Sequence, residues 1–203
     1  KCFAIVVEAL ECNPDQDFLG KLYMSLELGN HWKGQFFTPY NVCECMAGIT
    51  INDNVQTLEK QEWISVNDPA CGAGATLVAA ANIFHRKKIN YQTQVLFTAN
   101  DIDRVVAQMC YIQLSLLGCA GWVAVANTIS NPVCGDPLMP VEKPGQEFWY
   151  TPFYFREEWN CRRQVQIFKK ICGPWITPIE ERNPGKITFY FDFEKGEYKC
   201  QNS

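Results

Sequence analysis

The feature that most constrains the fold is an alternation of short apolar runs and amphipathic segments between residues 63 and 126. Three runs have the length of strands: 63–66, 94–99 and 122–126. Two segments between them repeat apolar residues at the helical period: 75–85 and 103–117. Strands that alternate with helices of this length indicate an α/β fold, a doubly wound parallel sheet covered on both faces.

The composition is that of a chain with an ordinary apolar core. Hydrophobic residues make up 47% and charged residues 20% of the chain, which excludes a disordered polypeptide. No run of apolar residues is long enough for a membrane span, and the first twenty residues carry acidic side chains where a signal peptide has a basic and then apolar stretch. We therefore expect no membrane association.

The cysteines and histidines bear on compartment and metal binding. The eleven cysteines are odd in number and several fall inside apolar periodic segments, so we expect reduced thiols in a cytoplasmic protein. The chain has no CxxC pair, and its only histidines are His31 and His85. We expect no structural metal site.

The regions flanking the alternation differ in character. Helical spacing predicts short helices at 18–28 and 41–49. After Asn127, four prolines within thirteen residues predict an irregular loop or linker. A basic helix at 157–171 and a hairpin that turns near Gly196 are predicted beyond it.

We accordingly expect three regions. They are an N-terminal helical lead at 1–50, a core at 51–140, and a C-terminal extension with the basic helix and hairpin at 141–203.

A glycine-containing loop joins the first predicted strand to the first predicted helix, with the sequence Asp68-Pro69-Ala70-Cys71-Gly72-Ala73-Gly74. Glycines let the backbone approach a ligand closely, and the helix N-terminus beyond presents free N–H groups. The alternative is a tight turn without a ligand. The position in the first βα unit favours a binding loop.

Acidic residues follow the second predicted strand, in Asn100-Asp101-Ile102-Asp103. Ligands of doubly wound sheets lie outside the carboxyl ends of the strands, where an acidic residue accepts hydrogen bonds from ribose hydroxyls. Alternatively, both acids only cap the following helix. Together with the glycine loop, they indicate a nucleoside site.

These two motifs, preceded by Gly34-Gln35-Phe36-Phe37-Thr38-Pro39, resemble the adenine-N6 DNA methyltransferases, and among them the modification subunits of type I restriction systems. The resemblance covers about residues 18–130. It implies a Rossmann-like S-adenosylmethionine-dependent methyltransferase domain that acts on DNA, with a specificity subunit as a partner.

The resemblance also implies a cofactor site. It places Phe37, Thr38 and Pro39 against the methionine end of S-adenosyl-L-methionine, and Asp101 on the ribose with Ile102 against the adenine. Asn127 stands where the family has an acidic residue near the adenine amino group. The loop residues implied around the amino acid moiety are Asp68, Ala70, Gly72 and Gly74.

The target-base motif departs from the family pattern. Members carry Asn or Asp, two prolines and an aromatic residue after a fourth strand, to hold and stack the flipped adenine. This chain has Asn131-Pro132-Val133-Cys134, without the second proline and the ring, and with no room for a strand after Asn127. Asn131 and Pro132 are the candidate catalytic residues. The alternative is a simple turn dipeptide.

The C-terminal part offers candidate nucleic-acid contacts. Rings in 148–155 are able to stack on bases, although such clusters more commonly belong to a core or an interface. The basic helix offers phosphate contacts or a solvated face. Its cationic residues are Arg156, Arg162, Arg163, Lys169 and Lys170.

Two classes of function remain open. The first is an enzyme that methylates the N6 atom of adenine in DNA, or alternatively a substrate other than DNA. The second is a catalytically silent S-adenosylmethionine-binding protein that acts by association with a restriction-modification complex. The degenerate Asn131 motif favours the second class, and the two cofactor motifs are common to both.

Overall fold

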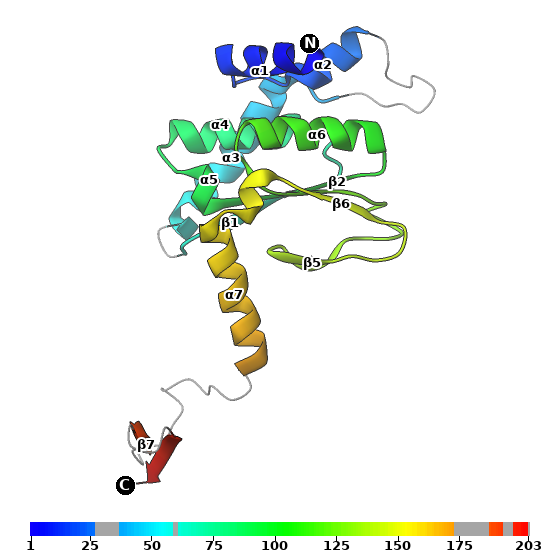
Figure 1. Ribbon diagram of the computed structural model, residues 1–203. Helices are drawn as coiled ribbons and strands as arrows, with labels where there is room; N and C mark the ends of the chain where they lie inside the picture. Colours follow the sequence, from blue (N-terminus) through cyan, green and yellow to red (C-terminus); the bar gives the residue numbers. More distant parts are fainter. Residues whose placement is uncertain (27–36, 59–60, 173–186, 193–196, 203) are drawn as a thin grey trace. The chain divides into compact units, whose positions relative to one another are not determined.

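The computed structural model describes residues 1–26, 37–58, 61–172, 187–192 and 197–202 (Figure 1). The chain forms two compact units, Lys1–Arg163 and Gln164–Ser203. The boundaries expected at residues 50 and 140 fall inside a helix, Tyr40–Leu58, and a strand, Met139–Val141, and the division into three regions stays a prediction. Within the described residues, every helix is too short or too polar to cross a lipid bilayer.

The first unit is built on a four-stranded sheet with the order β1-β2-β3-β6. The strands β1 (Ile64–Asp68), β2 (Val95–Asp101) and β3 (Ala120–Val125) are parallel, whereas β6 (Glu147–Tyr150) pairs antiparallel with β3. The three parallel strands match the three predicted runs, shifted by at most two residues. Within the described part of the chain, no strand pairs with the outer edge of β1.

Helices cover one face of this sheet. α4 (Ala75–Arg86) and α6 (Arg104–Leu116) lie side by side over it, with α3 (Tyr40–Leu58) packed against α4 and the short α5 (Tyr91–Gln94) leading into β2 (Figure 1). The core on this side contains alternate residues of β2 and β3 together with apolar residues of the helices: Val95, Phe97, Ala99, Val123, Leu77, Phe84, Cys110 and Leu114. Six of the seven β2 residues are buried, as a parallel strand covered on both faces requires.

The opposite face has a different cover, which corrects the prediction of helices on both faces. The hairpin of β4 (Cys134–Asp136) and β5 (Met139–Val141), the 3-10 turn η2 (Pro152–Phe155) and the first turns of α7 (Glu157–Cys172) provide it. The second core cluster includes Leu96, Trp122, Leu138, Tyr154 and Trp159. Aromatic rings therefore supply the apolar area that a second helical layer has in a doubly wound fold.

The segment after Asn127, predicted as irregular, contains three strands. The prediction was wrong because proline is compatible with short edge strands, where no ladder hydrogen bond is lost. Pro140 lies in β5 opposite Gly135, whose φ of 96° lets the chain turn tightly there. No strand lies between Asn127 and Asn131, as the sequence spacing predicted.

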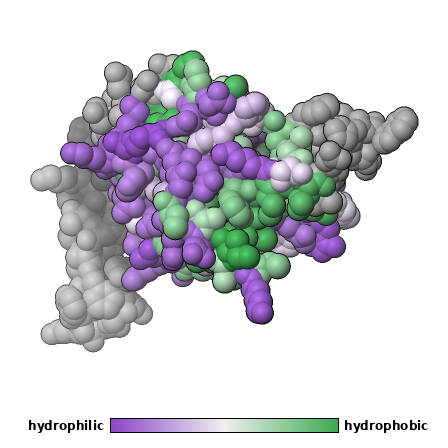
Figure 2. All heavy atoms as spheres, turned by 90° about the horizontal axis from the view of Figure 1, so that it is seen from above, coloured by the Kyte–Doolittle hydropathy of each residue, from purple (hydrophilic) through white to green (hydrophobic). Residues whose placement is uncertain are grey.

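Two N-terminal helices, α1 (Cys2–Cys12) and α2 (Phe18–Ser25), complete the first unit. The sequence predicted α2, although three residues longer, and did not predict α1. Figure 2 views the molecule from the side of these helices and shows hydrophobic and hydrophilic side chains gathered in separate areas. The large apolar residues exposed on α1 and α2 are Phe3, Ile5, Leu22 and Leu26.

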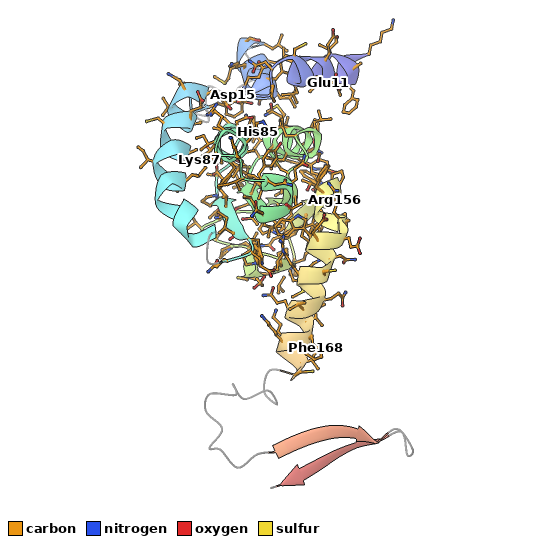
Figure 3. The ribbon with its side chains drawn as sticks, turned by 90° about the vertical axis from the view of Figure 1, so that its left-hand side faces the viewer. Glu11, Asp15, His85, Lys87, Arg156 and Phe168 are labelled. Atoms are coloured by element: carbon orange, nitrogen blue, oxygen red, sulfur yellow. The ribbon has the colours of Figure 1, made fainter. Side chains whose placement is uncertain are left out.

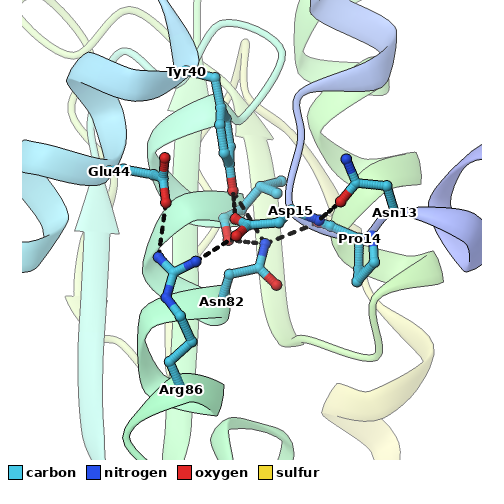
Figure 4. A network of polar contacts seen from close by, with 8 residues as sticks. Asn13, Pro14, Asp15, Tyr40, Glu44, Asn82 and Arg86 are labelled. Carbon is cyan, nitrogen blue, oxygen red and sulfur yellow. Dashed lines mark hydrogen bonds and ion pairs between the residues drawn. The ribbon is translucent and has the colours of Figure 1, made fainter.

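A polar network fastens the linker between α1 and α2 to α3 and α4 (Figure 4). Asp15 accepts a hydrogen bond of 2.6 Å from the Tyr40 hydroxyl and forms an ion pair with Arg86. Arg86 also contacts Glu44 at 2.8 Å, and Asn82 donates to the Tyr40 hydroxyl oxygen at 3.1 Å. Burial and the hydrogen bond to Asp15 raise the pKa of Tyr40, which keeps the hydroxyl a donor.

The second unit contains the later turns of α7 and a two-stranded hairpin. β7 (Ile187–Asp192) and β8 (Glu197–Asn202) pair antiparallel, in the register Ile187↔Asn202 to Asp192↔Glu197. Both the helix and the hairpin match the elements predicted from the sequence.

The buried Trp159 attaches α7 to the rest of the first unit, and substituting it tests this attachment. Its side chain is 0% exposed, its indole nitrogen donates to the Gln92 carbonyl at 2.8 Å, and its ring packs edge-on against Trp63. We expect Trp159→Ala to lower the free energy of unfolding by about 3 to 5 kcal/mol. Phe168→Ala on the same helix, where the side chain is 58% exposed (Figure 3), should change it by less than about 0.5 kcal/mol. Urea denaturation followed by tryptophan-independent circular dichroism measures both, and equal effects would contradict this packing.

Candidate functional site

A cleft of about 850 Å³ lies at the carboxyl ends of the three parallel strands. It is lined by residues 17, 37–38, 69–73, 75–76, 101–103 and 126–129. These segments are distant in the sequence, and the sheet brings them together because parallel strands end at the same edge. Seven of the ten predicted cofactor residues line the cleft: Phe37, Thr38, Ala70, Gly72, Asp101, Ile102 and Asn127.

The glycine loop forms one wall of the cleft. Gly72 and Gly74 have φ values of 51° and 95°, in the left-handed region that glycine adopts without strain. A Cβ atom on Gly72 would lie 3.3 Å from the Phe37 ring, so Phe37 lies directly over the loop. Gly74 is not in the lining, since a Cβ atom there would lie 2.8 Å from the Cys110 sulfur. Its role is to let α6 approach the start of α4.

The two acids after β2 have separate roles. Asp101 accepts a hydrogen bond from the Gly72 N–H at 2.8 Å through Oδ2 and another from the Asp103 N–H at 2.9 Å through Oδ1. Asp103 caps α6 by accepting from the Val105 N–H at 2.8 Å, as predicted. Ile102, between them, lines the cleft and is 68% exposed. A carboxylate and an apolar side chain thus stand side by side at the rim.

Asp68 supports the loop from behind. Its Oδ1 atom accepts from the Ala70 N–H at 3.1 Å, and it is not part of the cleft lining. Burial raises the pKa of Asp68, and the nearby charge of Asp101 raises it further, although hydrogen bonds from Ala70 and Thr76 oppose the shift. Pro39 is likewise outside the lining, at the start of α3, and residues 34–36 of the upstream motif lie outside the described residues.

The turn after β3 forms the facing wall. The Asn127 side-chain oxygen accepts from the Ile129 and Ser130 N–H groups, at 3.0 Å each, so it is engaged within its own turn. The resemblance implied that Asn127 lies near the adenine amino group of the cofactor, and this stays a prediction. The Thr128 hydroxyl donates to the Pro69 carbonyl at 2.6 Å and joins the two walls.

Two buried polar residues of the site were missed by the sequence analysis. Asn100, 5% exposed, donates from its side chain to the Thr128 hydroxyl oxygen. Gln113 on α6, 0% exposed, donates to the Ala73 carbonyl of the glycine loop at 2.8 Å. Neither carries a local sequence signal, because their partners lie 28 and 40 residues away.

The candidate catalytic residues lie apart from the cleft lining. Asn131 donates from Nδ2 to the Pro144 carbonyl at 3.1 Å, and Gln146 donates to the Asn131 carbonyl at 2.9 Å. Asn131 and Pro132 thus belong to a turn held by the segment before β6. This arrangement matches the alternative of a turn dipeptide.

The basic helix uses two of its arginines for packing. Arg162 donates to the Thr93 carbonyl and stacks on Trp159, with the guanidinium carbon 4.5 Å from the ring centroid. Burial lowers the pKa of Arg162. Arg163 donates to the Tyr154 carbonyl at 2.8 Å. Lys169 and Lys170 are exposed cationic residues on α7. Arg156 (Figure 3) precedes α7, and it lies 4.9 Å from the Phe153 ring centroid and 3.9 Å from the Glu158 carboxylate.

The remaining candidates for chemistry have structural explanations. Cys71 is buried, and the pKa of its thiol is raised by a hydrogen bond with Cys110 and by burial, which disfavours a nucleophilic thiolate. His85 lies exposed at the end of α4 (Figure 3), where a helix C-terminus favours positive charge. Ten of the eleven cysteines, all except Cys200, are found as free thiols, and no metal-binding cluster occurs among the described residues.

Comparison with known proteins identifies the class to which this fold and cleft belong. The family model of the N-6 DNA methylases matches residues 15–153. This is more than half of the chain, and it includes the cleft with all three parallel strands. The chain therefore belongs to the N-6 DNA methylase family. Comparisons with curated proteins and with solved structures gave no match.

The raised pKa of Asp68 predicts a pH dependence of stability. Because its pKa is higher in the folded protein than in the unfolded chain, the folded state binds more protons above about pH 4. The free energy of unfolding should therefore fall as the pH rises from about 4 through the folded-state pKa. We expect Asp68→Asn, which still accepts from Ala70, to remove this fall. Identical pH profiles for the two proteins in urea denaturation would refute the assignment.

Proposed function

We propose that the chain binds S-adenosylmethionine in this cleft and serves as the cofactor domain of a DNA adenine-N6 methyltransferase. The observation that carries the proposal is the convergence of Phe37, Gly72, Asp101, Ile102 and Asn127, from four separate segments, around one cavity. The volume of about 850 Å³ lies within the usual range of small-molecule sites. Membership of the family supports the same reading.

The chemistry of the lining fits an adenosyl ligand. A carboxylate can accept about four hydrogen bonds, two on each oxygen. Asp101 accepts one backbone hydrogen bond on each oxygen, so it can still accept hydrogen bonds from ribose hydroxyls. Ile102 offers an exposed apolar surface for the adenine ring. Gly72 lacks a side chain, so Phe37 packs close to the backbone of the glycine loop and both line the cleft. When bound, the cofactor supplies an electrophilic methyl group on a sulfonium.

The residues of this chain have only to bind and orient, because methyl transfer to a nitrogen needs no strong base. What the acceptor requires is a polar group that holds its amino nitrogen in line with the methyl group. Asn131 is the candidate that the sequence offers, and its amide is occupied by Pro144. This observation favours a second candidate function, a cofactor-binding protein that is silent by itself and acts in association with a restriction-modification complex.

DNA and a specificity subunit are the partners that accompany the proposal. The contact with DNA phosphates would use the exposed cations of α7, Lys169 and Lys170, since Arg162 and Arg163 are engaged in packing. We also propose that the protein is cytoplasmic, because DNA and reduced cysteine thiols occur together in that compartment.

Cofactor binding is tested by calorimetry with S-adenosylmethionine and its demethylated product. We expect Asp101→Ala to weaken binding by about 1 to 3 kcal/mol, because it removes charge-assisted hydrogen bonds. Asp103→Ala removes the cap of α6 and no ligand contact that the proposal assigns, and serves as the matched control. Absence of binding of either compound to the wild-type protein would refute the proposal.

Methyl transfer separates the two candidate functions. Apart from Phe37, the described lining has no ring, and base stacking on an aromatic side chain is worth about 1 to 3 kcal/mol. We expect the chain alone to transfer labelled methyl groups to unmethylated DNA slowly or not at all. The rate should be roughly ten- to a hundredfold below that of a methyltransferase with a complete target-base motif.

Partner subunits and one substitution complete this assay. If turnover occurs, Asn131→Ala should nearly abolish it while cofactor affinity stays within a few-fold. Rapid methylation by Asn131→Ala would show that another residue holds the nitrogen. No methylation by the wild type with a partner and bound cofactor would favour the silent binding protein.

A further inference from the structure

The cleft contains a buried carboxylate, Asp17, that neither cofactor motif includes. Asp17 precedes α2 and lines the cleft, and it is only 4% exposed. Its Oδ1 atom accepts from the Gly20 N–H at 2.9 Å and from Gln113 Nε2 at 2.8 Å. Both donors are neutral, and no described cation forms an ion pair with Asp17.

Gln113 fixes this carboxylate relative to the glycine loop. The Gln113 amide nitrogen donates to Asp17 and to the Ala73 carbonyl, at 2.8 Å each, while its oxygen accepts from the Leu19 N–H at 3.2 Å. These partners determine which way the amide points, since two are acceptors and one is a donor. Asp17 is therefore held in a defined place beside the glycine loop, although the loop begins more than fifty residues later in the sequence.

The second carboxylate oxygen of Asp17 is left for a ligand. The described residues form hydrogen bonds only with Oδ1 of this side chain. A Cβ atom on Gly20 would lie 1.9 Å from Oδ2, so the absence of a side chain at this position lets the carboxylate pack over the first turn of α2. Both described partners of this buried carboxylate are neutral, so a cationic ligand would supply the opposite charge that it lacks.

The charged residues that line the cleft also favour a cationic ligand. Its charged residues, within the described part of the chain, are Asp17, Asp101 and Asp103, and all three are acidic. The proposed function assigns Asp101 to the ribose, and Asp103 is half-buried and caps α6. Asp17 is the most buried of the three, and the Gln113 amide joins it to Ala73 of the glycine loop.

We infer that Asp17 binds the primary ammonium group of the ligand's amino acid moiety. The inference rests on the proposed function, which puts an α-amino acid in this cleft, and it adds the residue that recognises its positive charge. Gln113 then acts as a positioning residue for Asp17. A short glycine-containing loop and one buried carboxylate together match the carboxylate and ammonium ends of a zwitterion.

The test compares two ligands that differ only at this group. They are S-adenosylhomocysteine and its analogue with hydrogen in place of the amino group, and calorimetry on the 203-residue chain measures both. The wild type should bind the amino compound about 10- to 100-fold more tightly, the ratio expected for a charge-assisted hydrogen bond. In Asp17→Asn this ratio should fall to a few-fold, because affinity for the amino compound is lost and affinity for the analogue is kept.

The substitution is chosen to keep the fold. Asparagine caps helices as well as aspartate and still accepts from Gly20 and Gln113, and circular dichroism checks that the variant is folded. Asp103→Asn removes one negative charge from the same lining and should leave the ratio unchanged. If Asp17→Asn does not fold, Asp17→Ser retains a capping oxygen and takes its place in the same comparison.

The outcomes separate this inference from the proposed function. Equal affinity of the wild type for both ligands, or an unchanged ratio in Asp17→Asn, would overturn the role of Asp17 and leave cofactor binding intact. A variant that loses both ligands equally would show that Asp17 only organises the cleft. A wild-type chain that binds neither ligand would overturn the proposed function and this inference with it.

Discussion

One carboxylate, that of Asp101, holds together the ends of the strands on which the cleft depends. It accepts from the Gly72 N–H across the cleft and from the Asp103 N–H in its own turn, so the two βα turns are fixed to each other. Backbone hydrogen bonds extend the sheet into the same region, because Cys71 donates to the Asn100 carbonyl and Ala126 donates to the Asp101 carbonyl, both at 3.0 Å. All three turns beyond the parallel strands thus form one continuous surface.

The sequence predicted this part of the protein well, because local patterns determine it. The strands β2 and β3 are buried on both faces and appear as short continuous apolar runs, and the helices show the helical period. These two strands, the shorter and more exposed β1, α4 and α6 were located to within about two residues. The cap at Asp103 follows from one residue type at one position. The convergence of Gly72 and Asp101 follows from topology, since parallel strands place their carboxyl ends together.

Features that depend on distant partners were not predictable in this way. Gln113 looks like a polar residue on a helix, and only its contacts with Asp17 and Ala73 explain why it is fully buried. Arg162 and Arg163 look like a phosphate-binding surface, yet long side chains also cover apolar area, and here they stack on Trp159 and Tyr154. The strands after Asn127 were hidden by prolines that edge strands tolerate.

The acidic lining also constrains how such a domain meets DNA. Three carboxylates, Asp17, Asp101 and Asp103, surround the cavity, and they repel a phosphate backbone at distances within about 8 Å at physiological ionic strength. A neutral base is not repelled, whereas its flanking phosphates are. A cationic ligand in the cleft offsets part of this charge, so under the proposed function the loaded protein meets DNA at a lower electrostatic cost than the empty one. The contacts that attract phosphate then belong to surfaces away from the cleft, and on α7 these are the cations that packing leaves exposed.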